Sequence, residues 1–597
     1  MGSISLELEY VDVLIVGGGP VGLITAYQLA LTLPPSPDKH RRIRIIEEHP
    51  KSTQDRHGRA ITLFPRTSEM LDQLGLADAL AQQCFACRST VSYDREGKEV
   101  NGKNRACWAF MEDMNDSTVW DFALVLRQRY QEEVFRQALR EKGVMLEAPL
   151  KLVDIAVDEA AVNGRYKVTA TLQDGLTGAC HTVKCKYLVG ADGGRSFVRR
   201  ALQIPFEGSS TEDKWVRIDG LIETNLPKPR AYCSIESPTH GNVLWAPLDR
   251  GATRIGFAFT PERQNAYSIS DEAAAVKEAI AAVKPFSLSF KEVHWFTIYS
   301  VGQRVARSFF VKDCVFLAGD ACHTHSSGAA QGMNTGIHDA VNLGWKLSLV
   351  LQGVVRPEVL LPSYERERRP NVMKLIAYDR DIARLMTMQL PEEWTGDPGA
   401  DPNEVLGQVM AEAASFTSGL SICYERDGVL NVAGSFKPVK LGPGPGERAP
   451  DVELQKPGTF ETTRLHRETP NRARFYAVVF VGDPVYTSQL IPRIFSSVRN
   501  SSYISDPQLP LSWSTIIAGN TGPSAYELLG GTEPLGRVFF DKAGTAHARY
   551  GIDTRKGAVV VLRPDGWVGT VARLEEGVVG EVEAYFRGFM MHDIGKI

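Results

Sequence analysis

Three glycines have the spacing that brings a peptide backbone close to a phosphate. Gly17, Gly19 and Gly22 follow a short apolar run, residues 11–16 (VDVLIV), and precede residues 23–31, whose apolar side chains have helical spacing. In such a strand–turn–helix unit, the first glycine permits a tight turn. The second lets the backbone approach a pyrophosphate, and the third lets the helix pack on the strand. Free amides and the positive dipole at the helix start attract phosphate. The pattern predicts a dinucleotide site.

A carboxylate stands where a ribose could be bound. Residues 43–46 (IRII) form the next apolar run, and Glu47 follows it directly. A carboxylate at the end of this strand can accept hydrogen bonds from ribose hydroxyls. The separation from Gly17 is longer than usual, and the proline-rich segment 33–42 (LPPSPDKHRR) accounts for the excess as a loop. The alternative is a solvated acid at a strand end, and the glycine pattern favours the ribose role.

Two later motifs at strand ends indicate which dinucleotide binds. Residues 187–196 run from an apolar strand into ADGGRS, which contains Asp192 and Gly193, and residues 315–320 (VFLAGD) end in Asp320. A glycine-rich loop and a helix follow Asp320. A second GxGxxG fingerprint does not accompany them. One dinucleotide site in an interrupted binding domain is the arrangement of a flavoprotein.

These motifs together resemble a known family. They are the Gly17, Gly19 and Gly22 turn with Glu47, ADGGRS at 191–196, and AGDACHTH at 318–325 followed by QGMNTGIHDAVNLGWKL at 331–347. In this order, over residues 10–370, the chain resembles the class A FAD-dependent aromatic hydroxylases (flavin monooxygenases). More narrowly, it resembles their phenol 2-monooxygenase-like branch.

The resemblance implies particular contacts to FAD. Glu47 and Arg59 correspond to adenosine and pyrophosphate contacts, and Gln128 to a glutamine that touches FAD. Asp320 corresponds to the acid that holds the ribityl chain. The remaining implied positions are the motif linked to FAD and transient NADPH, and the loop facing the flavin pyrimidine edge: Asp192 and Gly193, and Gly332, Met333 and Asn334.

The resemblance also implies a reaction. NADPH (or NADH) reduces bound FAD, O₂ adds at flavin C4a, and the resulting hydroperoxide delivers one oxygen atom to a phenolic or quinoid ring, in secondary metabolism. The flavin supplies the reactivity, and the protein supplies position, charge and exclusion of water. The main alternative is Baeyer–Villiger insertion or epoxidation on a polycyclic polyketide or terpenoid. A flavoprotein oxidase without oxygen insertion, or a non-catalytic flavoprotein, is the other alternative.

An inserted region supplies the candidate substrate pocket. Residues 211–304 hold alternating apolar stretches, which predict a mostly antiparallel sheet with one face over the flavin. These stretches are 231–235, 242–248, 253–259 and 293–299. The candidate pocket residues are aromatic, and each one singly is more typical of an ordinary core: Tyr232, Trp245, Phe257, Trp295 and Tyr299.

The family's phenol-activating groups are not retained. Residues of other types stand at the family positions for an aspartate, an arginine, a tyrosine and a proline beside the flavin: Ile61, Leu248, Gly256 and Ser327. Candidate replacement bases are His57, Asp55 and Tyr299, and a histidine titrates near the pH that suits proton abstraction. The alternative for His57 is a surface loop position. The loss of polar groups predicts a substrate larger than phenol, such as a polyketide- or terpenoid-derived phenol or quinone.

Composition excludes several other classes. The net charge of −4 gives no support to a nucleic-acid binder, and no apolar run approaches the ~18 residues of a membrane span. Nine scattered cysteines fit a reducing compartment, so we expect a cytoplasmic protein. The one CxxC, Cys84 to Cys87, lacks further nearby ligands, so we expect a structural pair and no metal. The expected partner is a small aromatic molecule.

The expected fold class is α/β: a Rossmann-type FAD-binding domain interleaved with a mostly antiparallel substrate sheet, plus a C-terminal thioredoxin-like α/β domain. RPDGWVG at 563–569 resembles the last domain of phenol hydroxylases. That domain lacks a CxxC, which excludes a dithiol redox role. The resemblance implies that it serves structure and homodimer contact. The 597 residues would make about four domains of average size. The expected divisions are 1–210 (FAD-binding, with some substrate-domain strands near 88–122), 211–304 (substrate sheet), 305–395 (FAD-binding, second part), 396–450 (helix and linker) and 451–597 (thioredoxin-like).

Overall fold

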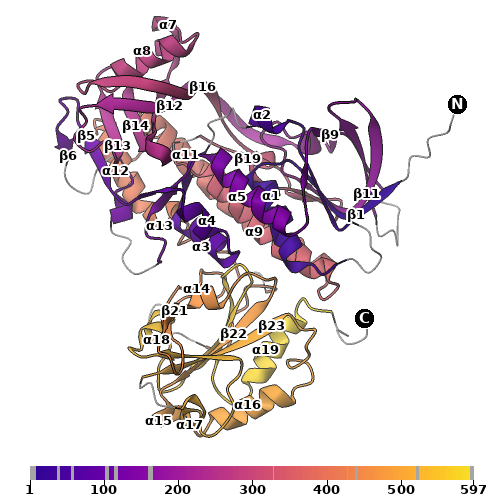
Figure 1. The fold of residues 1–597 in the computed structure, drawn as a ribbon. Helices are drawn as coiled ribbons and strands as arrows, with labels where there is room; N and C mark the ends of the chain where they lie inside the picture. Colours follow the sequence, from indigo (N-terminus) through magenta and orange to yellow (C-terminus); the bar gives the residue numbers. More distant parts are fainter. Residues whose placement is uncertain are drawn as a thin grey trace, which may run out of the picture.

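The computed structural model describes residues 8–35, 41–54, 60–100, 107–112, 118–158, 166–326, 328–426, 428–436, 442–519 and 524–591. Three large sheets organise this part of the chain. In Figure 1 the third sheet and its helices (orange and yellow) lie below the rest of the molecule, which holds the other two sheets (indigo to salmon).

The first sheet carries the glycine turn at the end of a central strand. Its order is β17-β18-β11-β1-β2-β8, with β10 paired to β11 and β9 paired to β10. β1 pairs in parallel with both β11 and β2. Its last six residues are all buried and five of them are apolar; the sixth, Asp12, pairs with Arg42 and Lys186. The strands are β1 (Glu9–Val16), β2 (Ile43–Ile46), β8 (Leu146–Glu147), β9 (Leu150–Val157), β10 (Val168–Asp174), β11 (Cys180–Gly190), β17 (Phe310–Val311) and β18 (Val315–Leu317).

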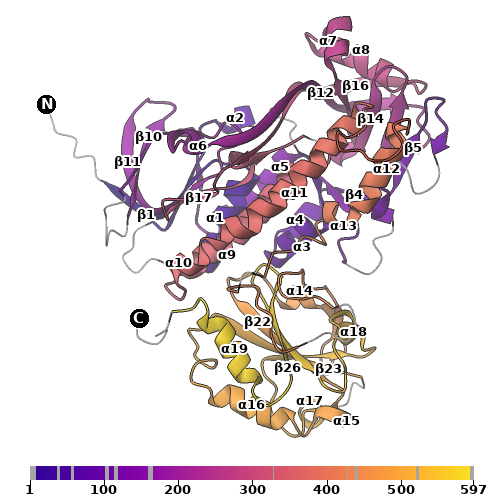
Figure 2. The same cartoon turned by 180° about the vertical axis from the view of Figure 1, so that it is seen from behind.

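Helix α9 (Gly332–Leu351) is the central helix of this part of the molecule. Its residues 333–350 are all buried, as expected of a helix that is covered on every side. It packs against α1 (Pro20–Thr32), and α1 packs against α5 (Gln128–Glu141). The long helix α11 (Ser363–Met386) runs beside it (Figure 2). Within the described ranges, none of the helices combines the length and apolarity that crossing a membrane requires.

The second sheet is antiparallel except for one parallel pair, β13 with β5. Its order is β19-β16-β12-β15-β14-β13-β5-β6. Two 19-residue strands, β12 and β16, pair with each other in antiparallel register and are the longest strands of this sheet. β12 begins at Phe206, before the predicted start of the substrate region, and none of the predicted stretches includes it. The strands are β5 (Thr90–Tyr93), β6 (Glu99–Val100), β12 (Phe206–Thr224), β13 (Tyr232–Ser237), β14 (Gly241–Pro247), β15 (Thr253–Phe259), β16 (Leu288–Ala306) and β19 (His323–Thr324).

The third sheet forms the C-terminal domain. β22, β23 and β24 are parallel, and β25 and β26 continue from β22 in antiparallel pairing. Helices α16 (Ile491–Asn500) and α19 (Val578–Arg587) pack against each other and cover it. This mixed sheet confirms the predicted thioredoxin-like fold. The strands are β20 (Glu453–Gln455), β21 (Thr462–Arg464), β22 (Phe475–Gly482), β23 (Leu511–Ala518), β24 (Arg537–Asp541), β25 (Ala558–Leu562) and β26 (Val568–Arg573).

A buried ionic cluster joins the C-terminal domain to helices α9 and α11. Arg563, in the loop after β25, donates both terminal nitrogens to Glu367, at 2.6 and 2.9 Å. It also donates to Asp565 at 2.8 Å, and Lys346 donates to Glu367 at 2.7 Å. The Trp345 indole donates to Asp565 at 2.9 Å. The RPDGW loop therefore packs against α9 and α11, and each of its charged groups lies next to a group of opposite charge.

We predict that the nine cysteines divide into two fast-reacting thiols and seven slow ones. Only Cys180 and Cys423 are exposed. Burial raises the pKa of the Cys84 and Cys87 thiols to about 11, so neither is a thiolate at neutral pH. Titration of the folded protein with a thiol reagent should count two thiols rapidly, and nine after denaturation. A lower rapid count in Cys84→Ser or Cys87→Ser would contradict the structural interpretation of the CxxC.

Candidate active site

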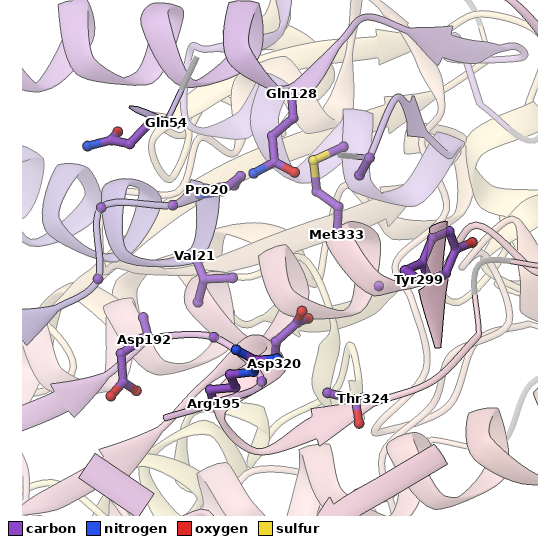
Figure 3. A pocket seen from close by; sticks show the side chains of 18 of the residues that line it. Pro20, Val21, Gln54, Gln128, Asp192, Arg195, Tyr299, Asp320, Thr324 and Met333 are labelled. Carbon is purple, nitrogen blue, oxygen red and sulfur yellow. The ribbon is translucent and has the colours of Figure 1, made fainter. Parts of the chain in front are cut away.

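A cavity of about 1220 Å³ opens between the first and second sheets. One wall is the β1–α1 turn, the end of β11, the loop at 318–326 and the start of α9. The other wall is the sheet of β12, β14, β15 and β16. Figure 3 shows Asp192, Asp320, Met333 and Tyr299 around the same space. The volume exceeds the roughly 300–1,000 Å³ of an ordinary ligand pocket, so it suits two ligands.

The three glycines of the β1–α1 turn have three different surroundings. Gly17 has φ +117°, and a Cβ there would lie 2.1 Å from the carbonyl oxygen of Ala191. A Cβ on Gly22 would lie 2.0 Å from the carbonyl oxygen of Gly17. A Cβ on Gly19 would meet no protein atom within 4 Å. Gly17 and Gly22 are therefore required by the protein, and Gly19 borders space that a ligand can fill.

Glu47 holds the glycine turn from the neighbouring strand. It follows β2, and its Oε2 accepts the N–H of Gly18 at 2.8 Å. Its Oε1 accepts the N–H of His49 at 3.0 Å. The side chain is half-buried and lines the cavity. Glu47 therefore fixes the turn and presents a carboxylate beside it.

Asp192 divides its two carboxylate oxygens between the protein and the cavity wall. Oδ2 accepts the N–H groups of Phe197 and Val198, at 2.7 and 3.0 Å, at the start of α6 (Phe197–Ala201). Oδ1 is buried and has no hydrogen-bond partner among the described residues. Burial raises the pKa of this carboxyl group. With Gly193 beside it, Asp192 leaves one acceptor to be satisfied at the edge of the cavity.

The loop that carries Asp320 is held in place by Asp339 on α9, which is buried beneath the cavity wall. Asp339 Oδ2 accepts the N–H of Gly319 at 3.0 Å and lies 2.7 Å from His323 Nε2. Its Oδ1 accepts the Nε–H of Arg368 at 2.7 Å. Cys322, His323 and Asp339 also present metal-ligand atoms within 4.8 Å of one another, but Arg368 already occupies the carboxylate. Asp320 itself is exposed toward the cavity.

We predict that Asp339 makes stability depend on pH in the acid range. Burial raises the pKa of this carboxyl, but Arg368 and His323 lower it by more, to about 2. The folded pKa lies below the unfolded value of about 3.9, so the contribution, about 2.6 kcal/mol, is complete above about pH 5 and is lost as pH falls towards 2. Urea unfolding should show that Asp339→Asn destabilises more at pH 7 than at pH 3. An equal difference at both pH values would contradict the prediction.

The start of α9 faces the cavity with backbone and thioether groups. Gly332 and Met333 line it, and the first turn of α9 contains no acidic residue and no side-chain cap. Asn334 instead points into the protein. Its Oδ1 accepts the N–H of Phe64 and the hydroxyl of Thr67, both at 2.8 Å, and its amide donates to Thr62. Asn334 therefore ties the start of α9 to residues 62–67.

Alternation along the second sheet decides which predicted residues face the cavity. Asp219 pairs with Arg254 and Trp295, and Trp215 pairs with Ala258 and Tyr299, so these rows share one face. Trp295, Tyr299 and Tyr232 line the cavity. Figure 3 shows the Tyr299 ring at its edge.

Three residues predicted for the substrate pocket do not line the cavity: Trp245, Phe257 and Leu248. Trp245 and Phe257 lie on the opposite face, where they pack with α8 (Glu272–Ala282). The Trp245 indole donates to the carbonyl of Pro229 at 3.0 Å. Leu248 is fully buried in a different core and does not line the cavity. Strand alternation excludes the two aromatic residues, because residues of odd number on β14 and β15 face α8.

Gly256 has a role that its family position did not suggest. It pairs with Arg217 across β12 and β15. A Cβ on Gly256 would lie 2.3 Å from Arg217 Nη1 and 2.6 Å from its Cδ. The missing side chain is therefore the space in which the Arg217 side chain lies. Arg217 and Arg254 stand in no recognisable motif, so the sequence alone did not predict them.

Several predicted residues remain predictions. Asp55, His57, Arg59 and Ser327 lie outside the described residues. Ile61 is 5% exposed and lines the cavity, as does Gln128, whose amide donates to Glu132 at 2.7 Å.

The described residues fit FAD. The open space at Gly19, the unpartnered oxygen of Asp192 and the exposed carboxylate of Asp320 lie along one wall of the cavity. These are contacts for a pyrophosphate at a helix start and for a polyhydroxylated chain. Bound FAD supplies the activation of O₂, with electrons from NAD(P)H.

Comparisons with known proteins agree with this geometry. Residues 10–379 match the family described as FAD binding domain, and residues 531–594 match the phenol hydroxylase C-terminal dimerisation domain. The chain is 28% identical to phenol 2-monooxygenase fsqG of Aspergillus fumigatus, over 95% of each chain. It is 29% identical to 3-hydroxybenzoate 4-monooxygenase of Comamonas testosteroni, over 97% of this chain and 95% of the other.

Among solved structures, aklavinone-11 hydroxylase in complex with FAD and aklavinone has the same fold. The TM-score is 0.69 at 21% identity, over 97% of this chain and 98% of the other. The family match covers most of the chain, and it includes all the motifs that line the cavity's FAD side. The chain therefore belongs to the FAD binding domain family, and it is an FAD-dependent aromatic monooxygenase of the phenol 2-monooxygenase-like branch.

Proposed function

We propose that this enzyme inserts one oxygen atom into the ring of a polycyclic phenol or hydroxyquinone. The observation that carries the proposal is the cavity, because one large space joins the FAD wall to a wall of aromatic and basic side chains. Aklavinone, the ligand of a protein with the same fold, is the kind of molecule that such a space suits. A monocyclic phenol would leave much of this space to water.

The proposed roles of the residues follow from their places. Gly19 lets the backbone meet the FAD pyrophosphate, Glu47 accepts from the ribose, and Asp320 accepts from the ribityl hydroxyls. Gly332 and Met333 meet the flavin ring at the start of α9, where amide dipoles favour negative charge. Tyr299, on the sheet, is the described candidate for proton transfer with the substrate.

We also propose a homodimer in the cytoplasm that uses NADPH. The match to a phenol hydroxylase C-terminal dimerisation domain supports the dimer. The nine free cysteines support a reducing compartment. The NADPH preference rests on the family resemblance and is tested by comparing the two nucleotides as reductants.

The proposed function is tested with ¹⁸O₂. The holoenzyme, NADPH and a panel of monocyclic and polycyclic phenols are incubated, and the product mass and the peroxide are measured. We expect one ¹⁸O atom in a ring-hydroxylated polycyclic product. Efficient coupled turnover of plain phenol would refute the substrate class. Ring-expanded or epoxide products would favour Baeyer–Villiger insertion or epoxidation, and peroxide alone across the panel would refute oxygen insertion.

A further inference from the structure

The two walls of the cavity meet where β19 joins the second sheet. The FAD wall includes residues 318–330, which lead into α9 and form the FAD-side loop, and the sheet wall includes β16. Backbone pairing links them at two positions, Arg304 with Thr324 and Val305 with His323. Oxygen transfer needs its two reactants, one on each wall, at a set separation, and a misplacement of about 1 Å can cost about 100-fold in rate. Side chains that fasten this junction therefore affect the reaction.

One buried carboxylate on α11 is hydrogen-bonded to both walls. Asp379 is fully buried, on a helix that packs against β16 and extends to the second sheet (Figure 2). Its Oδ2 accepts the N–H of Ser326 at 2.7 Å and the side-chain amide of Gln303, on β16, at 2.8 Å. Its Oδ1 accepts the hydroxyl of Ser326 at 2.6 Å. Asp379 therefore joins the FAD-side loop to the substrate sheet through three hydrogen bonds.

Ser326 extends this restraint to the rest of the FAD-side loop. Its hydroxyl donates to Asp379 and accepts the N–H of Gly328 at 3.1 Å. A Cβ on Gly328 would lie 3.0 Å from the sulfur of Met386 and 3.1 Å from Cγ2 of Ile382. Asp379, Ile382 and Met386 are three and four residues apart, so they share one face of α11. The FAD-side loop is therefore packed directly on that face.

Hydrogen bonds from the two walls compensate the burial of the Asp379 carboxylate. Among the described residues, the basic side chain nearest to its oxygens is that of His325, whose Nδ1 lies 3.8 Å away and donates instead to the carbonyl of Ser326 at 2.8 Å. Burying a carboxylate is costly unless it is hydrogen-bonded, and hydrogen bonds to a charged group are stronger than those between neutral groups. All three donors belong to the walls, so the carboxylate is satisfied only while the walls keep their register.

We propose that Asp379 is a positioning residue that keeps the FAD-side loop in register with the substrate sheet, so that oxygen reaches the ring instead of leaving as hydrogen peroxide. Asp379 does not line the cavity and acts through Ser326 and Gln303. Productive turnover consumes NADPH, H⁺, O₂ and the ring compound, and yields NADP⁺, water and the hydroxylated ring. Uncoupled turnover consumes NADPH, H⁺ and O₂, and yields NADP⁺ and H₂O₂. The inference rests on the proposed function for the insertion of oxygen.

The test measures the ratio of hydroxylated product to NADPH consumed, because this ratio does not depend on the fraction of enzyme that is folded. The holoenzyme is incubated with NADPH, ¹⁸O₂ and 2-hydroxyanthraquinone. Asp379→Asn keeps the size of the side chain but sets an amide donor against the donors of the two walls. The ratio should fall at least about fivefold, with peroxide accounting for the difference. Gln303→Met removes only the sheet-side donor and should also lower the ratio, even if Asp379→Asn fails to fold.

Asp381→Asn makes the same chemical change two residues later on α11 and serves as the control. Asp381 is half-buried and does not line the cavity, so this variant should keep the wild-type ratio. A wild-type ratio in Asp379→Asn or in Gln303→Met, or an equal fall in Asp381→Asn, would overturn the proposal.

Hydrogen exchange of the backbone amides in residues 323–333 gives a second readout that needs no turnover. In the holoenzyme without substrate, exchange should become about tenfold faster in Asp379→Asn and Gln303→Met, and should stay unchanged in Asp381→Asn. If the wild type placed no ¹⁸O in the product, the proposed function would be contradicted for this probe. The exchange rates would then decide the role of Asp379, and wild-type exchange in Asp379→Asn would overturn it.

Discussion

Gly17→Ala is expected to weaken FAD binding at least about 100-fold, which corresponds to about 2.7 kcal/mol. The backbone at Gly17 has φ +117°, and holding a side-chain-bearing residue in a sparsely populated region costs about 1–3 kcal/mol. The new Cβ would also lie 2.1 Å from the carbonyl oxygen of Ala191, so β1 and β11 must separate where the turn leaves the sheet. Titration of the apoprotein with FAD, followed by flavin fluorescence, measures the loss.

Gly19→Ala is the matched control for strain within the protein itself. It adds the same methyl group two residues away, where no protein atom lies within 4 Å. The free energy of unfolding of the apoprotein should therefore change by less than about 0.5 kcal/mol. FAD binding should still weaken, because the methyl group enters the space proposed for the pyrophosphate. If Gly19→Ala bound FAD like the wild type, the pyrophosphate would not lie against this turn.

The parts of the site that depend on local sequence could be predicted. The turn at Gly17 to Gly22 needs glycines for reasons that lie within a few residues, and β2 was predicted with its observed ends, Ile43–Ile46. The glycine spacing, the strand ends and the long buried helix α9 all leave periodic patterns. A dinucleotide site could therefore be predicted from these patterns, and the resemblance of the motifs to a known family implied FAD and the fold class before any contact was known.

The substrate wall depends on pairings that one strand does not reveal. Alternation along β14 and β15 separates two faces, but it does not say which face turns to the flavin, so Trp245 and Phe257 were placed on the wrong side. Arg217 gains its meaning from Gly256 on another strand, 39 residues later in the chain. Asn334, predicted as part of the flavin loop, uses its side chain to hydrogen-bond with residues 62–67. Long-range register decides each of these cases.

Arg563→Met is expected to lower the free energy of unfolding by about 3–5 kcal/mol, because removing one partner of a buried ionic cluster leaves an uncompensated charge. Arg563 and Lys346 are opposed by Glu367 and Asp565, so the four charges sum to zero in the wild type and to −1 in the variant. Arg573→Met, an exposed position on the neighbouring strand β26, should change stability by less than about 0.5 kcal/mol. Glu367 lies on α11, beside α9, and the start of α9 lines the cavity. Arg563→Met should therefore also weaken FAD retention. Denaturant unfolding and FAD content should be measured on both variants. If the two variants had equal free energies of unfolding, the buried ionic cluster would not be what holds the C-terminal domain to the flavin domain.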